Sequence, residues 1–502
     1  MKPFLTFVLF ALIALTNNCD LKEDDDRSID DIHFCLSEGI LDAPYELLLI
    51  NGKYHLYYAS ADNSSDFKVG YAVTNDLVHW NQNTNVIIDS TVRINNLSLV
   101  VDWNNMSGFG NDDQPVLAFY TNHLDSKSRK IQTNQNIYIS YSNDNGMTWQ
   151  KELNNSIVLN DLSEDIEDIK VIWHEEMQQW VMLVLSGYHI RFYNSANLIN
   201  WEYVSSFGDA VEDKSGDWTT LDFSQVGTDA LNNKKWVLFV STTAGSPNNG
   251  SGTQYFVGDF NGFEFSPLTH KPKWVDNGTD NFAGVAFTNY FETEEPSYYL
   301  GSIFNSKYED FNTNEGILES YTITRKLSLI NKFNDYYLRS EPAKALDIPD
   351  NGKILIKEQD YSGELTLNEK PELPIKLNLT FDVNNRIYLD FAEIYGIEIT
   401  NNEGTKIIIG YHSLRRYFYI TCISPKDDKP EENTIIDYAY YAIDQPVMDM
   451  TLFIDQNSVE LYAIDGFISM TKKCEALNKI KQIKLFATDG KVKLLNGYQV
   501  EL

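Results

Sequence analysis

The sequence predicts an all-β protein in which a β-propeller is followed by a β-sandwich. From His33 onward, short runs of alternating apolar and polar residues are separated by Asn, Asp and Gly turns, a pattern typical of strands. The chain contains 30 Tyr, 27 Phe and 9 Trp, and large flat side chains suit the packing between propeller blades. A loose repeat, in which a turn leads to a strand-ending Trp, indicates one supersecondary unit used several times.

The expected elements follow in order along the chain. Strands are predicted at residues 54–58 (YHLYY), 69–73 (VGYAV), 137–141 (IYISY), 181–185 and 236–240 (WVLFV), and the repeat occurs at 75–80 (NDLVHW), 143–150 (NDNGMTWQ) and 195–202 (SANLINWE). These features place the propeller at 33–338. A polar, Pro-containing stretch at 339–352 is the expected linker, and runs such as LTFDV, KIIIGY and MTLFID predict a two-sheet sandwich over 353–502.

The N-terminus predicts secretion. Residues 1–18 combine Lys2 with an apolar run over 4–15, which is too short to cross a bilayer and typical of a signal peptide. Cys19 follows directly and resembles the lipidated cysteine of bacterial lipoproteins; secretion without lipidation is the alternative. The acidic stretch 19–32 is expected to be a flexible tether. It also resembles the signal with which Bacteroidetes export lipoproteins to the outer-membrane cell surface, although an ordinary linker has the same composition.

The net charge and the cysteine content restrict the classes of ligand and cofactor that the protein is expected to bind. A formal charge of −32 disfavours nucleic acid and anionic lipid, since both require basic patches, and favours a neutral ligand. We expect no cofactor, and the cysteines have no metal-ligand spacing. Cys422 and Cys474 are able to form a disulfide in an oxidising compartment, while buried free thiols are an equally good interpretation.

Six segments, taken in order, resemble glycoside hydrolase family 32, the invertases, inulinases and levanases. They are residues 51–58 (NGKYHLYY), 70–80 (GYAVTNDLVHW), 100–110, 138–149, 168–182 (DIKVIWHEEMQQWVM) and 280–289 (DNFAGVAFTN), and the stretch 452–466 is similar to the family's sandwich signature. The resemblance covers both domains. It implies a five-bladed propeller followed by a β-sandwich, with a fructan or a related sugar as the ligand.

The family's chemistry needs three carboxylates: a nucleophile, a general acid/base and a transition-state stabiliser. The nucleophile motif W-M-N-D-P-N-G matches residues 40–46 and places Ala43 at the nucleophile position. The stabiliser motif R-D-P matches 167–169 and keeps Asp168, whereas W-E-C-P-D matches 218–222 and places Thr219 at the acid/base position. Because threonine cannot act as an acid at neutral pH, we expect no catalysis.

Two nearby acids are candidates for a relocated active site. Asp42 and Asp217 each lie within two residues of a missing carboxylate. A one-residue step along a strand reverses the direction of the side chain, so Asp42 is expected to point away from the funnel unless a bulge intervenes. Asp217 is expected on the far side of Trp218. We therefore favour solvated turn acids for both.

The sugar-binding shell also departs from the family. Ala59 stands at the position of a glutamine, Val69 at that of a tryptophan, and residues 95–98 (NNLS) at that of an F-S-G-S loop. The terminal fructose pocket is therefore expected to be remodelled.

Three functions remain open. The favoured one is a non-catalytic lipoprotein of the cell surface that captures fructan, levan or inulin, for an uptake system. The second is an active fructan glycosidase with relocated carboxylates, and the third is a docking subunit for an outer-membrane glycan transporter. The ligand-binding candidates are Asp168, the leading one, with Asp42 and the aromatic residues Tyr45, Trp103, Trp218 and Phe282. For Trp103 and Phe282, a place in the propeller core is an equally good interpretation.

Overall fold

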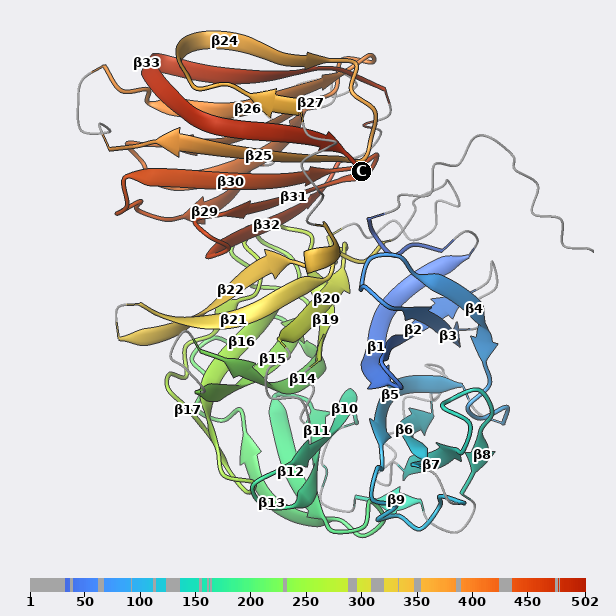
Figure 1. Cartoon of the computed structure of the whole chain (residues 1–502). Coiled ribbons are helices and arrows are strands. Elements are labelled where there is room, and N and C mark those ends of the chain that lie inside the picture. Colours follow the sequence, from blue (N-terminus) through green and yellow to red (C-terminus); the bar gives the residue numbers. More distant parts are fainter. Residues whose placement is uncertain are drawn as a thin grey trace, which may run out of the picture.

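The expected strands that lie within the described residues form, and the computed structural model arranges them as a five-bladed β-propeller and a β-sandwich (Figure 1). A further strand expected at IYLDF (387–391) lies mostly outside the described residues. The residues described are 32–36, 39–61, 67–91, 93–111, 114–122, 136–152, 156–159, 162, 165–228, 233–287, 296–307, 320–332, 334–346, 354–384, 390–423, 436–474, 477 and 479–502. The predicted signal peptide, Cys19 and all of the tether except Ile32 lie outside them.

The first three blades are antiparallel sheets built in chain order. Blade 1 contains β1 (Ile40–Ile50), β2 (Lys53–Ala61), β3 (Phe67–Thr74) and β4 (Asn81–Val86). Blade 2 contains β5 (Ile94–Val101), β6 (Val116–Asn122), β7 (Asn136–Ser142) and β8 (Gln150–Lys151), and β9 (Ile157–Val158) also pairs with β7. Blade 3 contains β10 (Asp168–His174), β11 (Gln179–Ser186), β12 (His189–Ser195) and β13 (Glu202–Phe207).

The last two blades complete the ring. Blade 4 contains β14 (Trp218–Gly227), β15 (Lys234–Thr242), β16 (Gly252–Phe260), β17 (Phe265–Pro267) and β18 (Lys273–Trp274). Blade 5 contains β19 (Phe282–Phe287), β20 (Ser297–Ser302), β21 (Arg325–Lys332) and β22 (Asp335–Pro342). The innermost strands contact one another in the closed order β1, β5, β10, β14, β19 and back to β1. The first strand of every blade therefore faces the propeller axis.

The internal repeat seen in the sequence is a recurring turn. Asp76, Asp144 and Asn197 each accept backbone N–H bonds through Oδ1 from residues two to four positions onward, and each also bonds a Ser or Thr hydroxyl two residues before it. The side-chain oxygen thus closes the loop between the third and fourth strands in blades 1, 2 and 3. The repeat occurs at the equivalent turn of each of these blades, and it therefore indicates where one blade is repeated along the sequence.

Apolar clusters fill the spaces between neighbouring blades. Separate clusters join blade 1 to 2, 2 to 3, 3 to 4 and 4 to 5. A fifth cluster joins blade 5 to blade 1 and also includes Phe453 and Tyr462 of the sandwich. Phe34, just before β1, contributes to this closing cluster, and its carbonyl accepts a bond from Tyr321 N. The ring is therefore closed by packing between the first and last blades.

The second domain is one curled sheet whose strands lie in the order β29-β28-β27-β26-β33-β25-β30-β31-β32, with β23 and β24 also paired to β33. The strands are β23 (Ile354–Ile356), β24 (Gln359–Glu369), β25 (Ile375–Asp382), β26 (Ile394–Asn401), β27 (Lys406–His412), β28 (Tyr417–Ile423), β29 (Ile436–Tyr440), β30 (Val447–Ile454), β31 (Ser458–Ala463), β32 (Ile468–Lys473) and β33 (Ile480–Glu501). The sheet folds over a continuous core of aliphatic and aromatic side chains.

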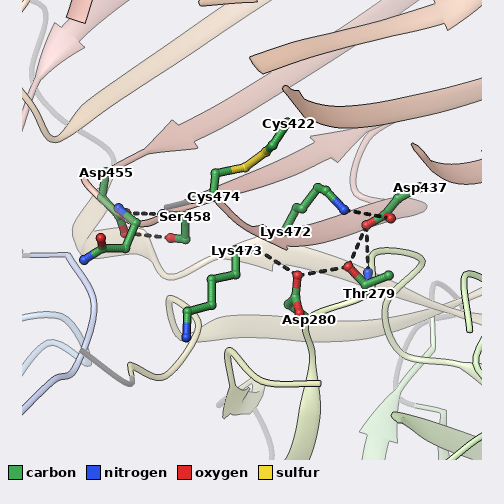
Figure 2. Close-up of a disulfide and its surroundings, with 10 residues drawn as sticks. Thr279, Asp280, Cys422, Asp437, Asp455, Ser458, Lys472, Lys473 and Cys474 are labelled. Atoms are coloured by element: carbon green, nitrogen blue, oxygen red, sulfur yellow. Dashed lines mark hydrogen bonds and ion pairs between the residues drawn. A yellow bond between two sulfur atoms is a disulfide. The ribbon is translucent and has the colours of Figure 1, made fainter. Parts of the chain in front are cut away.

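The two ends of this strand order are tied to each other. Cys422 of β28 forms a disulfide with Cys474, which follows β32 (Figure 2). Lys472 of β32 also donates to Asp437 of β29 at 2.9 Å. The curled sheet is therefore nearly closed, and of the two interpretations left open for these cysteines the structure has the disulfide.

The junction between the domains differs slightly from the expectation. Residues 339–342, expected in the linker, complete β22 and pair with β21. Their side chains alternate in burial, so they extend the last blade. A short 3-10 helix, η1 (Lys344–Leu346), follows, and β23 begins at Ile354.

Buried charges hold the two domains together. Arg325 of β21 is fully buried and donates to Asp276 of the propeller at 2.8 Å and to Glu460 of the sandwich at 2.9 Å. His33 lies between Asp455 and Glu460, at 2.6 and 2.9 Å. Because Arg325, Asp276 and Glu460 are buried, their charges depend on one another, and the Arg325–Glu460 pair crosses the domain interface.

Candidate functional site: the axial pocket

A pocket of about 240 Å³ lies at the start of the five innermost strands, where the propeller axis opens. All five blades contribute to it. Its lining consists of Asp42, Ala43, Pro44, Tyr45, Ala59, Asn95, Asn96, Leu97, Glu167, Asp168, Ile169, Lys170, Thr219, Thr220, Leu221, Ala283, Gly284 and Val285. The three positions matched to the family's carboxylates, Ala43, Asp168 and Thr219, therefore share one cavity.

Backbone irregularities decide which side chains reach this pocket. The pairing of β1 with β2 shifts register between Leu41 and Pro44 and again between Pro44 and Glu46. A bulge inserts a residue and re-aims the side chains beside it. Asp42 accordingly lines the pocket together with Ala43, although regular alternation would send one of them away. The bulge that the sequence argument required for Asp42 is thus present.

Asp42 reaches solvent through the pocket opening. The surrounding protein nevertheless raises the pKa of its carboxyl above the usual value, and the bond that its Oδ1 accepts from Ala43 N only partly offsets this. The carbonyl of Asp42 is fixed by Tyr321 Oη at 2.6 Å. Asp42 is therefore an acid of the pocket lining directly next to Ala43, the residue matched to the nucleophile position.

Asp168 is anchored to two blades. Its Oδ1 accepts a bond from Ile169 N at 2.9 Å, and its Oδ2 accepts one from Leu221 N of β14 at 2.8 Å. Burial raises the pKa of this carboxyl to about 7, because desolvation outweighs the two backbone N–H bonds. Asp168 is therefore held in a fixed orientation and titrates close to neutral pH.

The position matched to the family's acid/base in the sequence is Thr219. Thr219 lines the pocket, and its hydroxyl is 3.4 Å from the carbonyl of Ser241. Asp217 is exposed and does not line the pocket, while its backbone atoms bond Thr243. The pocket lining contains three acids, Asp42, Asp168 and Glu167. Glu167 is exposed and matches the position of the arginine in the family's R-D-P motif.

A buried charge network lies beside the pocket, and its lysine, Lys170, is part of the pocket lining. Lys170 Nζ donates to Glu46 Oε1 at 2.5 Å and to Asp222 Oδ2 at 3.0 Å, and all three side chains are at most 7% exposed. Glu46 Oε2 also accepts from Ser98 Oγ of β5, and Asp222 Oδ2 accepts from Ala286 N of β19. The network therefore connects all five innermost strands.

The network carries two acids and one lysine. Burial raises the pKa of Glu46 to about 7, with Asp222 adding to the effect and Lys170 opposing it. Both acids raise the pKa of Lys170, which stays charged. Sequence reasoning missed this network, yet a signal existed: Glu46, Lys170 and Asp222 each stand within an apolar strand, where a charge needs a partner.

The aromatic candidates fare differently. Tyr45 lines the pocket and is half-buried, and burial raises the pKa of its phenol. Trp218 is only 2% exposed in the core between blades 3 and 4, stacked near Phe207, so the prediction that its face receives a sugar is wrong. The first residue of β14 faces the neighbouring blade because a register shift separates it from Thr220.

Trp103 and Phe282 also lie outside the pocket lining. Trp103 packs against Trp173 and Trp180 with ring centroids 5.5 and 5.1 Å away. Phe282 lies beside Phe304, and the pocket wall from its strand is made by residues 283–285 instead. For both residues the interpretation as packing side chains agrees with these contacts.

Most of the residues expected to alter the sugar-binding shell line the pocket. Ala59, Asn95, Asn96 and Leu97 all line it, whereas Val69 is buried between blades 1 and 2. Asn96 is itself occupied: its amide donates to the carbonyl of Glu167 and accepts from Thr121 Oγ1. The described residues contain no cluster of three or more His, Cys, Asp or Glu side chains placed to hold a metal ion. Within that same part of the chain, none of the helices has the length and apolarity to span a membrane.

Comparison with known proteins identifies the family. The model for the glycosyl hydrolases family 32 N-terminal domain matches residues 33–342, and that for the family 32 C terminal matches 353–501. The chain therefore belongs to glycosyl hydrolase family 32, as its resemblance indicated. It is 29% identical to a levanase of Bacillus subtilis, over 98% of this chain and 73% of the relative. It is 30% identical to an invertase of Schwanniomyces occidentalis, over 93% of this chain and 91% of the relative.

Solved structures agree with this assignment. A fructofuranosidase from Schwanniomyces occidentalis complexed with fructose superimposes with a TM-score of 0.77 at 28% identity, covering 95% of this chain and 99% of that one. An exo-inulinase from Aspergillus awamori gives a TM-score of 0.83 at 24% identity, with the same coverage, and shares the fold.

Proposed function

We propose that this protein binds the fructosyl units of a fructan in the axial pocket without hydrolysing them. The observation that carries the proposal is the composition of that pocket: Ala43 and Thr219 stand beside Asp168, the one acid kept at the three matched positions. Relatives named levanase, invertase and exo-inulinase support a fructan as the ligand.

The loss of two carboxylates removes both chemical steps of the family's mechanism. Without a nucleophile no glycosyl-enzyme intermediate forms, and loss of the general acid costs a further ~10²–10⁴-fold. The remaining groups suit binding. Asp168 offers a fixed acceptor for a sugar diol, Tyr45 an amphipathic ring, and Thr219 and Thr220 hydroxyls on the facing wall.

The experiment compares binding with hydrolysis on the same material. The purified protein is titrated with levan, inulin and their oligosaccharides in a calorimeter, and released fructose is measured over long incubation. We expect binding without release. Asp168→Ala should weaken binding by about 1–3 kcal/mol, the cost of losing a buried charge-assisted hydrogen bond. Failure of every fructan to bind would reject the proposal.

A gain-of-function variant tests the assignment of the lost positions. Ala43→Asp combined with Thr219→Glu restores a nucleophile and an acid to the same cavity, and we expect fructose release to appear at a rate at least ~10²-fold above the parent. Asp217→Glu is the matched control, because Asp217 does not line the pocket, and it should release nothing.

A second candidate function, a fructan glycosidase, is favoured by one observation. The bulge in β1 places Asp42 in the pocket beside Ala43, so a relocated nucleophile is sterically conceivable. The test is Asp42→Asn. Sugar release by the parent that is proportional to protein and vanishes in Asp42→Asn would establish the glycosidase and replace the binding proposal.

We also propose that the protein is anchored by a lipid on Cys19 at the outer surface of the cell, where it presents fructan to outer-membrane transporter subunits. The support is the sequence alone: the signal-like residues 1–18, the cysteine and the acidic tether. If the protein binds transporter subunits but no fructan, its function is that of a docking subunit and not fructan capture. Co-purification with the lipid anchor intact, with and without levan, separates the two.

A further inference from the structure

A group of four tyrosines lies on the outer face of the sandwich, at one end of the curled sheet. Tyr417 and Tyr419 belong to β28, and Tyr438 and Tyr440 belong to the neighbouring strand β29. In the strand register, Tyr417 stands opposite Tyr440 and Tyr419 opposite Tyr438. The residues between them are buried in the core, so all four phenols point outward. We call these four residues the tyrosine shelf.

The rings of the tyrosine shelf form a stepped surface. Tyr417 stands at 77–80° to Tyr438, Tyr440 and Tyr419, with ring centroids 4.8, 5.6 and 6.2 Å away. Tyr440 is 76% exposed. The ring of Tyr419 lies across Gly410 of β27, where an added Cβ would come within 3.0 Å of it. The ring of Tyr417 is therefore nearly perpendicular to the other three rings. A chain of sugar rings is able to stack along such a stepped surface.

A buried histidine beside the shelf gives an independent indication of a ligand. His412 of β27 is opposite Tyr417 in the register, with ring centroids 5.2 Å apart. It is only 5% exposed, yet its Nδ1 has no hydrogen-bond partner among the described residues. Its Nε2 is 3.6 Å from Glu393 Oε1. A buried ring nitrogen left without a partner costs free energy unless a bound molecule or water satisfies it.

Strand β29 of the shelf contacts the connection between β15 and β16 of the propeller. Asn248 lies in the connection between β15 and β16, and its amide bonds both backbone atoms of Tyr438, accepting from N at 2.8 Å and donating to O at 3.1 Å. That connection starts at Thr242, the partner of Trp218, next to Thr219 of the pocket wall. The contact therefore ties β29 to the end of blade 4 at which the pocket-lining residue Thr219 lies.

We propose that the tyrosine shelf is a second carbohydrate-binding surface, which holds the interior of a long fructan chain while an end occupies the axial pocket. Phenol rings stack on apolar sugar faces, and phenol and imidazole groups bond hydroxyls. The shelf consists of uncharged phenols on a chain of formal charge −32, which favours a neutral polymer over a polyanion. The identity of this polymer rests on the proposed function, whereas the shelf itself rests on the tyrosines and His412.

With two linked sites, the affinity for fructan depends on the length of the fructan chain. A polymer that engages both sites binds more tightly than either site alone, because the second contact is intramolecular. A short oligosaccharide reaches only one site. The shelf should therefore contribute to the affinity for long chains, and the pocket to the affinity for chains of any length.

The test measures Kd for high-molecular-weight levan, inulin and a fructan trisaccharide with the parent, Tyr440→Ala, His412→Ala and Asp168→Ala. Tyr203→Ala is the matched control, because Tyr203 is an exposed tyrosine on β13 of the propeller. We expect Tyr440→Ala and His412→Ala to weaken binding of the long polymers about 10–100-fold and to leave the trisaccharide unchanged. Tyr203→Ala should bind like the parent.

The outcomes separate the two sites. Long-chain binding by Tyr440→Ala and His412→Ala equal to that of the parent overturns the shelf, whatever Asp168→Ala does. If the shelf variants lose long-chain binding while Asp168→Ala binds every ligand like the parent, the shelf is a binding site and the pocket is not. No binding of any fructan by the parent overturns both, and capture of a protein ligand that Tyr440→Ala abolishes also replaces the carbohydrate with another occupant.

Discussion

Replacing Lys170 with methionine tests whether the buried charge network holds the five blades together. The change keeps the length of the side chain and removes the charge that pairs with Glu46 and Asp222, at 2.5 and 3.0 Å. Two buried acids are then left without a cation. Removing one partner of a buried pair costs about 3–5 kcal/mol, because the remaining charge stays desolvated.

This cost converts into a measurable shift of the melting temperature. The unfolding entropy is about 2.1 cal/mol/K per residue, so for the propeller segment matched at 33–342 a loss of 3–5 kcal/mol lowers Tm by about 5–8 °C. Differential scanning calorimetry at pH 8 measures it. Lys235→Met is the matched control: its pair with Asp259 lies near the surface, and such pairs contribute about 0.2–1 kcal/mol, or less than about 2 °C.

The pH dependence of the Tm difference between the parent and Lys170→Met provides a second test. Burial already raises the folded-state pKa of Glu46 in the parent, and in Lys170→Met it rises further because the opposing charge of Lys170 is lost. The penalty is therefore complete above this folded-state pKa and decreases as Glu46 becomes protonated. The gap in Tm between parent and variant should therefore narrow from pH 8 to pH 5. A Tm within about 2 °C of the parent at pH 8, or a gap that widens on acidification, would refute the reasoning.

Four further predictions follow from the same structure. Reduction of the Cys422–Cys474 disulfide, which spans 52 residues, should destabilise the sandwich by about 4 kcal/mol in urea titrations, and Cys422→Ser should make stability insensitive to reductant. Arg325→Met should cost about 3–5 kcal/mol and split the calorimetric transition, since it unpairs acids in both domains; a single unshifted transition contradicts this. Fructan affinity should rise with pH through about 7 as Asp168 ionises and accepts hydroxyls more strongly, and Asp168→Asn should have a flat profile. Cys19→Ala should turn a membrane-bound protein into a soluble one in cell fractionation, and continued membrane association would exclude the lipid anchor.

Local sequence patterns were sufficient for the architecture, whereas the assignment of substituted catalytic positions stays a prediction. Strand alternation and turn residues act over a few neighbours, so ranges such as 54–58 and 236–240 lie inside β2 and β15. The positions of Ala43, Asp168 and Thr219 follow from motif order along the chain, and all three line one pocket. The strands could be predicted because alternation along an extended chain is a local property that the sequence pattern itself specifies.

Tertiary structure decided which side chains reach the site. Asp42 enters the pocket because β1 is bulged, and a bulge reverses the face that regular alternation assigns. Trp218 lies in the core because blade 3 packs over it, and the Lys170 network exists because the ring of blades closes. The tyrosine shelf likewise needs β28 and β29 side by side. Each of these contacts joins residues far apart in the sequence, where no local pattern distinguishes a buried aromatic ring from an exposed one.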